Sequence, residues 1–299
     1  MKYDLIIVGA GPAGLTAGIY AARSGLKTAI ISRDIGGTAN NILKIENWPG
    51  YSGTGTDLVK NFYEHLKKYD VEFITDQVTN IEKSWKEFLV KTSNREFDAK
   101  SLILATGTIR RNLKIPGEEK LKGRGVSYCT TCDSFFFKNK TVAVIGGSDC
   151  AVGSAIALTD IAKKVYVLYR GEVFRCETIN LEKMKENKKI EIVYGAIPKE
   201  IKGENKVESL LIEKKGKTRE IKVDGIFIEI GSSPLIEFTK DLKLKLDKED
   251  FIIVDEEMKS SVPGVFAAGD ITNFKLKQVL VASSQGAIAA KSANEWLKN

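Results

Sequence analysis

The sequence predicts an α/β protein in which two nucleotide-binding modules share one chain. An apolar strand over Tyr3–Val8 leads into the glycine-rich turn Gly9–Gly14, and the same order returns where the β-branched run Thr141–Ile145 meets Gly146–Ala151. A strand, a glycine turn and a helix in this order make the first half of a dinucleotide-binding βαβ unit. The length of 299 residues also suits about two domains. The repeated turn therefore predicts paired nucleotide folds with mostly parallel sheets.

Each module is completed by a helix and a second strand. In the first, apolar residues at helical spacing predict a helix over Leu15–Ser24, a turn at Gly25 and a strand over Thr28–Ile31. In the second, we expect a helix to about Ile161 and a strand over Lys164–Tyr169. Both modules thus carry the same strand–turn–helix–strand pattern.

The rest of the chain predicts further strands and one long helix. Antiparallel meanders are expected over Phe73–Val90 and Ile192–Lys222, and a final helix from about Ser283 to Leu297. The other apolar runs expected to form strands are Ser101–Ala105, Ile190–Tyr194, Val207–Glu213 with Glu220–Ile221, Gly225–Ile230 and Gly264–Ala267.

Composition excludes several classes of protein. The apolar content of 43% with 28% charged residues is that of an ordinary globular protein, not a disordered one. The net charge of +7 is spread through segments such as Lys214–Lys222 without interleaved aromatic residues, so we expect acidic partners rather than nucleic acid. The charge-free stretch Leu5–Ala22 is broken by glycines, which argues against a membrane span. With no signal peptide and few cysteines, a cytoplasmic protein is expected.

The first glycine turn has the context that a nucleotide site needs. Glycines let the backbone turn tightly and approach a diphosphate, whose charge then lies at a helix N-terminus. An acid, Asp34, follows about 20 residues beyond the turn, where such folds bind a ribose. Ser32 lies nearer the expected strand end, so Asp34 as a surface turn residue stays an equal alternative.

The strongest chemical signal is Cys129-Thr130-Thr131-Cys132-Asp133. Two cysteines at this spacing can form a disulfide at the start of a helix, where the helix dipole lowers thiol pKa. The neighbouring Asp133 could act as a general acid. A zinc site is disfavoured because no second such pair occurs and the one histidine, His65, is remote. Two inert buried cysteines are the remaining alternative.

These motifs closely resemble those of the low-molecular-weight thioredoxin reductases, and the match runs nearly end to end. Thr130 and Ser134 depart modestly from that family's usual C-A-T-C-D-G. The matching segments are Gly9–Gly14, Glu46–Gly50, Ala105–Gly107, Gly125–Asp133 and Ala267–Asp270.

The resemblance implies two Rossmann-like three-layer domains, the second inserted into the first. Residues 1–113 and 243–299 would form the FAD-binding domain, and residues 114–242 an NAD(P)-binding-like domain that carries the cysteines. It further implies a cytoplasmic homodimer in which a donor reduces FAD, FAD reduces the Cys129–Cys132 disulfide, and the dithiol reduces thioredoxin or a thioredoxin-like protein. Cys132 would face the flavin and Cys129 would attack the partner, after a rotation of the inserted domain.

The same resemblance assigns the cofactor residues. Lys277 stands where the family has arginine, which leaves its contact open, and Trp48 is expected to pack near the flavin. The positions expected to bind FAD are Gly9, Gly11, Pro12, Ala13, Gly14, Ser32, Asp34, Asn47, Thr106, Gly107, Gly269, Asp270, Lys277, Gln278 and Val279.

The second nucleotide site is less complete. Ser148 replaces a glycine of the G-x-G-x-x-A turn, and a Cβ there would crowd the diphosphate. Of the family's 2′-phosphate cluster, Arg170 and Arg175 survive. Because these two arginines remain, we expect NADPH or NADH as the electron donor. Because the turn has lost a glycine, ferredoxin or a deazaflavin stays the alternative donor. The residues expected to bind the nucleotide are Gly146, Ser148, Asp149, Arg170 and Arg175.

The sequence fits two other functions less well. A flavoprotein reductase of a peroxiredoxin system would carry an extra N-terminal thioredoxin-like module, whereas here the first glycine turn starts at Gly9. A non-catalytic flavin-binding or redox-sensing protein would not need the complete C-x-x-C-D. Cys150 and Cys176 are expected to be structural or surface thiols.

Overall fold

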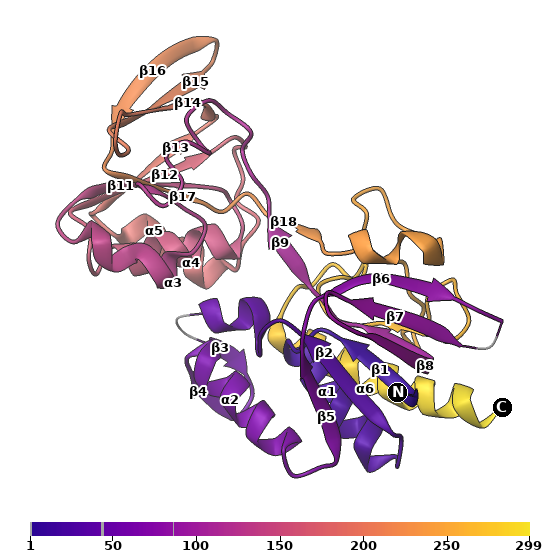
Figure 1. Ribbon diagram of the computed structural model, residues 1–299. Coiled ribbons are helices and arrows are strands. Elements are labelled where there is room, and N and C mark those ends of the chain that lie inside the picture. The colour runs from indigo at the N-terminus through magenta and orange to yellow at the C-terminus, as the bar shows by residue number, and fades with distance from the viewer. Residues whose placement is uncertain (1, 43–44, 86) are drawn as a thin grey trace. The chain divides into compact units, whose positions relative to one another are not determined.

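The computed structural model describes residues 2–42, 45–85 and 87–299, which divide into two compact units (Figure 1). Unit 1 combines both ends of the chain, Met1–Ile109 and Ser233–Asn299, and unit 2 is the insertion Arg110–Ser232. The second crossing comes earlier than the expected Leu242, because the 3-10 helix η3 (Glu237–Leu242) buries Leu242 in a core of unit 1.

Unit 1 is built on a sheet of order β5-β2-β1-β8-β7-β6, with β19 paired to β8. Strands β5, β2, β1, β8 and β19 are parallel, and β7 and β6 continue the sheet in antiparallel fashion. The strands are β1 (Lys2–Val8), β2 (Thr28–Ser32), β5 (Val71–Thr75), β6 (Val78–Lys83), β7 (Phe88–Thr92), β8 (Glu96–Leu104) and β19 (Val265–Ala267).

The remaining elements of unit 1 cover this sheet and connect it. Helix α2 begins where the Thr54 hydroxyl accepts a hydrogen bond from the backbone N–H of Asp57, a standard N-cap. These elements are α1 (Pro12–Arg23), η1 (Gly37–Asn41), β3 (Ile45–Trp48), β4 (Tyr51–Gly53), α2 (Gly55–Leu66) and α6 (Val279–Lys298). Strands β9 (Thr108–Arg110) and β18 (Ser232–Pro234) pair with each other where the chain crosses between the two units.

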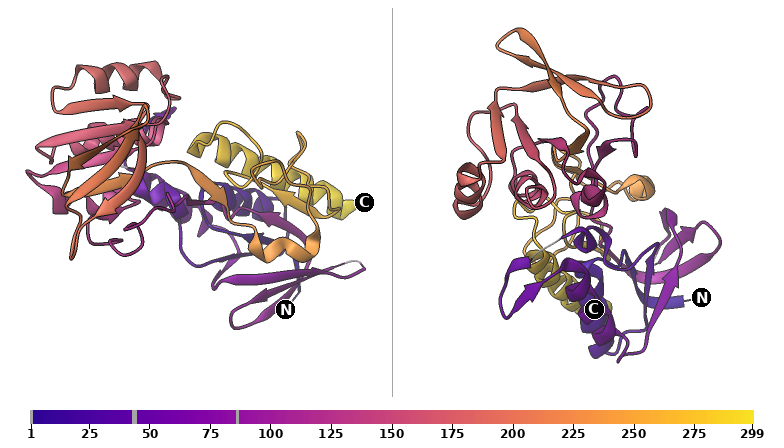
Figure 2. Two further views of the ribbon diagram at one scale, coloured as in Figure 1. Left: turned by 90° about the horizontal axis from the view of Figure 1, so that it is seen from above. Right: turned by 90° about the vertical axis from the view of Figure 1, so that its left-hand side faces the viewer.

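Helices α1 and α6, from opposite ends of the chain, lie side by side (Figures 1 and 2). Glycine makes their close approach possible: a Cβ at Gly286 would lie 2.1 Å from the backbone oxygen of Ala13. Helix α6 begins at Val279, about one turn before the expected Ser283. The approach brings the C-terminal helix against the first turn of α1.

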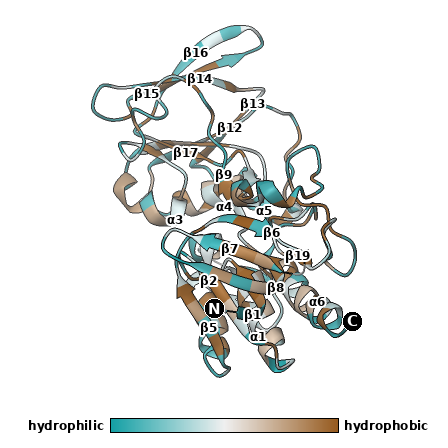
Figure 3. Cartoon of the chain, turned by 45° about the vertical axis from the view of Figure 1, so that its right-hand side comes forward, coloured by the Kyte–Doolittle hydropathy of each residue, from teal (hydrophilic) through white to brown (hydrophobic). Residues whose placement is uncertain are grey.

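Unit 2 contains a parallel sheet of order β10-β17-β11-β12-β13 and a separate antiparallel sheet β14-β15-β16. Strand β16 is largely exposed and appears teal in Figure 3. The elements are β10 (Val126–Ser127), α3 (Thr130–Asp133), η2 (Ser134–Phe137), β11 (Thr141–Ile145), α4 (Asp149–Leu158), β12 (Lys164–Tyr169), α5 (Thr178–Glu186), β13 (Ile190–Tyr194), β14 (Ile197–Lys202), β15 (Ser209–Lys214), β16 (Lys217–Lys222) and β17 (Gly225–Ile228).

In both segments predicted to be antiparallel meanders, the first strand pairs in parallel instead. Strand β5 pairs in parallel with β2 through Phe73 and Ile30, and β13 pairs in parallel with β12 through Ile192 and Val167. Only the later strands of each segment are antiparallel. Apolar alternation is the same in both kinds of edge strand, so it does not reveal the pairing direction.

The charge-free stretch near the N-terminus forms part of strand β1 and most of helix α1. Across residues 2–42, 45–85 and 87–299, the structure has no helix with the length and apolar character needed to cross a membrane.

The approach of α6 to α1 predicts that Gly286→Ala destabilises the protein by about 1–3 kcal/mol, since the helices must separate to admit a methyl group. Gly153→Ala is the control, because Gly153 is an exposed glycine of α4 with nothing within 4 Å of its added Cβ. That change should stabilise by about 0.5–1 kcal/mol. Urea unfolding measures both, and equal effects of the two substitutions would contradict the packing described.

Candidate active site

The two predicted redox cysteines form a disulfide in unit 2. Cys129 and Cys132 are bonded, with their Cα atoms 5.3 Å apart. Cys132 is exposed and Cys129 half-buried, so the pair lies at the protein surface. Strand β10 pairs with β17 immediately before the pair and anchors it to the sheet. The geometry is that of an accessible disulfide on a rigid support.

The backbone at Cys129 is fixed by its neighbours rather than by a long helix. Ser127 Oγ accepts a hydrogen bond from the N–H of Cys129 at 3.0 Å, and Cys129 Sγ accepts one from the N–H of Cys132 at 3.2 Å. Helix α3 is a single turn, Thr130–Asp133, so the expected contribution of a helix dipole is small. Asp133 lies within this turn, and its N–H bonds the Cys129 carbonyl at 3.2 Å.

The first glycine turn, in unit 1, packs closely on itself and on the segment that follows β8. A Cβ at Gly9, where φ is +106°, would lie 2.4 Å from the carbonyl oxygen of Ala105, and one at Gly14 would lie 1.9 Å from that of Gly9. Gly11 differs, because the nearest atom to its added Cβ is 3.9 Å away. The turn is therefore packed on its inner side and open at Gly11.

The start of α1 can receive an anion. Pro12 occupies its first turn, no side chain caps its N-terminus and no acidic residue lies in that turn. Its free N–H groups are therefore open to a diphosphate, a fit supported by the open space at Gly11. Ala13 completes the turn by packing against α6.

The two candidate ribose residues lie beyond β2. Ser32 is the last residue of that strand and is half-buried. The Asp34 carboxylate accepts a hydrogen bond from the N–H of Gly37 at 3.1 Å and lies at the surface. Asp34 thus has a local structural partner.

The Gly269–Asp270 segment follows β19 beside this turn. Gly269 has a φ of +82° and approaches the Cβ of Ala13, so these two predicted residues lie together. Burial raises the pKa of Asp270, while the Lys277 charge opposes the rise. The side chain sits in a desolvated position next to α1.

Gln285 holds this segment, and the sequence analysis missed it. Its Oε1 accepts a hydrogen bond from the N–H of Gly269 at 2.8 Å, and the residue is 3% exposed. Its Nε2 has no hydrogen-bond partner among the described residues. No sequence signal marks Gln285, because its partner lies 16 residues earlier and on another element.

Lys277 braces its own loop. Its ammonium donates to the carbonyl of Asp270 at 2.9 Å and to that of Thr272, and it lies 4.1 Å from the centre of the Phe251 ring. Burial lowers the pKa of Lys277, and the Asp270 charge opposes that effect. The lysine therefore shapes the loop that leads to Gln278, the N-cap of α6, and to Val279.

The other predicted flavin residues lie on unit 1 at the edges of this site. Thr106 Oγ donates to the carbonyl of Leu235 at 2.8 Å, and Gly107 has a φ of +64°. The Thr106 bond therefore joins the segment that leaves unit 1 to the segment that re-enters it. Asn47 is exposed on β3, and the Trp48 ring packs against Phe62 with ring centres 5.4 Å apart.

The second glycine turn, in unit 2, has different chemistry. Ser148 is the N-cap of α4 but its side chain makes no capping bond, and Asp149 places an acid in the first turn. The Asp149 carboxylate accepts a hydrogen bond from the N–H of Glu177 at 2.7 Å. Gly146 has a φ of +153°, and its added Cβ would lie 2.2 Å from the oxygen of Glu229.

The surviving arginines lie after β12. Arg170 and Arg175 are both exposed, and the N–H of Arg175 bonds the carbonyl of Gly147 at 2.8 Å. The loop that carries them therefore folds back onto the glycine turn. The Tyr169 ring lies close to Gly147.

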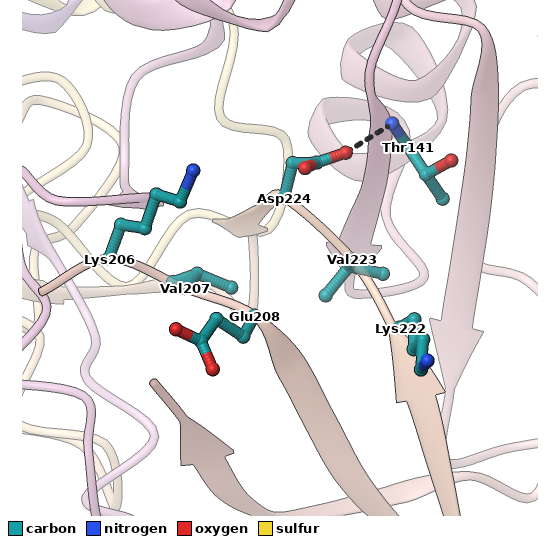
Figure 4. Close-up of a pocket in the computed structure, with 7 residues that line it drawn as sticks. All are labelled: Thr141, Lys206, Val207, Glu208, Lys222, Val223 and Asp224. Carbon is teal, nitrogen blue, oxygen red and sulfur yellow. Dashed lines mark hydrogen bonds between the residues drawn. The ribbon is translucent and has the colours of Figure 1, made fainter. Parts of the chain in front are cut away.

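A hollow of about 290 Å³ lies elsewhere in unit 2 (Figure 4). Lys206, Lys222, Glu208 and Asp224 border it, and Asp224 accepts a hydrogen bond from the N–H of Thr141 at 2.9 Å. Its positive and negative side chains balance, and none of the predicted redox residues lines it. The hollow is separate from the site described above.

Comparisons with known proteins agree on one family. Residues 3–286 match the family described as pyridine nucleotide-disulphide oxidoreductase. The thioredoxin reductase of Bacillus subtilis is 37% identical over 301 residues, which cover 99% of this chain and 95% of that protein. The crystal structure of Lactococcus lactis thioredoxin reductase in the FR conformation superposes with a TM-score of 0.97 at 39% identity, covering 99% of both chains.

Another solved structure is also similar to this chain. The ferredoxin-flavin thioredoxin reductase of Clostridium acetobutylicum is 32% identical, with a TM-score of 0.54, over 99% of this chain and 98% of that one.

The bond from Gln285 to Gly269 predicts that Gln285→Leu weakens cofactor retention. It leaves the Gly269 N–H unpaired, at a cost of about 1–3 kcal/mol, and loosens the segment that carries Asp270. The measurement is the fraction of flavin that stays bound after gel filtration, together with the thermal midpoint. Ser284→Ala, at the exposed neighbouring position, should change neither. Full retention by Gln285→Leu would contradict this role.

Proposed function

Because the chain belongs to the pyridine nucleotide-disulphide oxidoreductase family, and within it to the thioredoxin reductases, we propose that it carries electrons from NADPH or NADH through FAD to the Cys129–Cys132 disulfide and on to thioredoxin. The observation that supports this most is the accessible disulfide on a unit whose companion unit holds a complete dinucleotide turn. The chain is an oxidoreductase that acts on sulfur.

FAD fits the cradle of unit 1. The uncapped start of α1, with Gly11, would bind its diphosphate, and Asp270 would accept hydrogen bonds from its sugar-alcohol chain. FAD supplies a two-electron carrier at this site. Gln285 and Lys277 would keep the surrounding segments in place through their backbone hydrogen bonds.

The dithiol performs the exchange with the protein substrate. Two electrons and two protons cleave the Cys129–Cys132 bond and leave two thiols, for which Asp133 is the proposed proton donor. The thiolate of Cys129 would attack a partner disulfide and release one partner thiol. Cys132 would then displace the second, so that the enzyme disulfide re-forms and the partner leaves fully reduced.

The surface next to the cysteines suits a protein partner. Phe135 and Phe136 follow the pair and are 76% and 67% exposed, an unusual position for two large apolar rings. The whole net charge of +7 falls in unit 2, where 24 Lys and Arg face 17 Asp and Glu, while unit 1 balances 22 against 22. An acidic thioredoxin-like protein would be attracted to this unit.

Two donors are compatible with unit 2. Exposed Arg170 and Arg175 support the 2′-phosphate of NADPH. Ser148 and the acidic Asp149 weaken the turn, and the likeness to a ferredoxin-flavin thioredoxin reductase makes ferredoxin the second candidate. Anaerobic bleaching of the flavin by NADPH or NADH supports the nucleotide, whereas bleaching by reduced ferredoxin alone contradicts it.

A homodimer is proposed as the assembly. Tyr20 on α1 and Leu280 and Ile288 on α6 are exposed apolar side chains of two helices that pack together. Such a surface suits association with a second copy. The two thiols Cys150 and Cys176, which are not in a disulfide, support a cytoplasmic location.

Replacing Cys132 by Ser should abolish reduction of thioredoxin, because the mixed disulfide can no longer be resolved. Flavin content should not change, because the cradle lies in unit 1. Reduction of thioredoxin is measured through the reduction of insulin by reduced thioredoxin. The trapped mixed disulfide between Cys129 and thioredoxin is detected by mass spectrometry. Cys176→Ser controls for loss of a thiol from the same unit and should keep full turnover. Full turnover by Cys132→Ser would rule out this dithiol.

A further inference from the structure

The parallel sheet of unit 2 has one place where its strand order reverses. The chain runs from β11 to β12 and β13 on one side and returns to β17 on the other, so the reversal lies between β11 and β17. In open α/β sheets, ligands bind outside the carboxyl ends of the strands at such a point. Gly146 ends β11 there and Glu229 ends β17, joined by the bond from the N–H of Glu229 to the carbonyl of Ile145 at 2.8 Å.

A buried ion pair occupies this edge. The Glu229 carboxylate is 3% exposed and lies 2.6 Å from Nη1 of Arg110, and Ser154 Oγ donates to its other oxygen at 3.0 Å. Burial raises the pKa of Glu229, and the guanidinium charge opposes the rise. Ser154 and Arg110 therefore contact the two oxygens of one buried carboxylate. The ion pair keeps the Arg110 side chain beside the end of β17.

Arg110 also interacts with the start of α4. Arg110 is 30% exposed, and it is within hydrogen-bonding reach of the thiol of Cys150, the second residue of that helix. The nearest acid of the first turn, Asp149, is engaged by the N–H of Glu177. A partly exposed guanidinium thus lies beside the second glycine turn, where a nucleotide diphosphate would be placed.

We propose that Arg110, held near β17 by its ion pair with Glu229, binds a phosphate of the donor dinucleotide in the crevice of unit 2. This role rests on the proposed function. It adds to the donor site a residue that lies outside both the second glycine turn and the Arg170–Arg175 loop. A guanidinium binds phosphate through two parallel hydrogen bonds, and its charge is permanent. Arg110 would supply the contact that a backbone crowded by Ser148 gives less well.

Cys150 provides a readout that does not depend on turnover. It is exposed and adjacent to Arg110, so a nucleotide bound there should shield it from iodoacetamide, whereas the disulfide-bonded Cys129 and Cys132 do not react. Desolvation around the thiol raises the pKa of Cys150, so alkylation is run at mildly alkaline pH. Mass spectrometry follows the Cys150 peptide in the oxidised, flavin-loaded enzyme at increasing NADP⁺ and NAD⁺.

In the wild-type enzyme, one of the two nucleotides should slow alkylation of Cys150. Arg110→Met should raise the concentration for half-protection by about tenfold or more, as expected for loss of a charged contact. Glu229→Gln keeps the shape of the partner and should cause a smaller rise. Lys114→Met, which removes an exposed charge from the same segment, should leave half-protection unchanged.

The two proposals fail in different ways. Equal half-protection in the wild type and Arg110→Met, while NADPH or NADH still bleaches the flavin, overturns the role of Arg110 and leaves the donor in place. No protection and no bleaching in the wild type overturns the nucleotide donor and, with it, this role. If Arg110→Met fails to fold, Arg110→Lys keeps the charge without the fork, and unchanged protection there also overturns the proposal.

Discussion

The structure of unit 1 depends on backbone segments that approach too closely for any side chain. Gly9 meets Ala105, Gly14 meets Gly9, and Gly286 meets the carbonyl of Ala13. These contacts gather a turn near the N-terminus, the end of β8 and a helix near the C-terminus at one point. The proposed flavin cradle draws on the first two, since the diphosphate position and Gly107 belong to them, and the Gly269–Asp270 segment reaches the same turn at Ala13. A methyl group at any of the three contacts would displace the parts that the cofactor needs together.

The two glycine turns show how one pattern can serve unequal sites. Helix α1 begins without a cap and without an acid, so its N-terminus is open to an anion. Helix α4 begins with Ser148 and Asp149, and Asp149 is engaged by Glu177. The positive charge near the second turn comes instead from side chains, Arg110 among them. Under the proposed function, the donor site would bind mainly through side chains and the flavin diphosphate mainly through backbone N–H groups.

The local sequence pattern was enough to predict several strands and the disulfide. Strands β11 and β12 begin and end at the predicted residues, and the disulfide forms between the predicted cysteines. Pairing direction was not predictable, because β5 and β13 have the same alternation in either direction. Long-range partners were also invisible: Arg110 and Glu229 lie far apart in sequence, and Gln285 reaches Gly269 only after α6 packs. Lys277 illustrates the same limit, since its bonds to Asp270 and Thr272 follow from the loop shape.

The central claim is that flavin and dithiol act in series, and anaerobic reductive titration tests it most directly. Dithionite is added to the flavin-loaded enzyme while the visible absorption of the flavin is followed. Two carriers in series predict four electrons per chain before full reduction in the wild type, and two electrons in a variant with both Cys129 and Cys132 replaced by Ser. Two electrons in both proteins would show that the disulfide does not exchange electrons with the flavin, and would contradict the account.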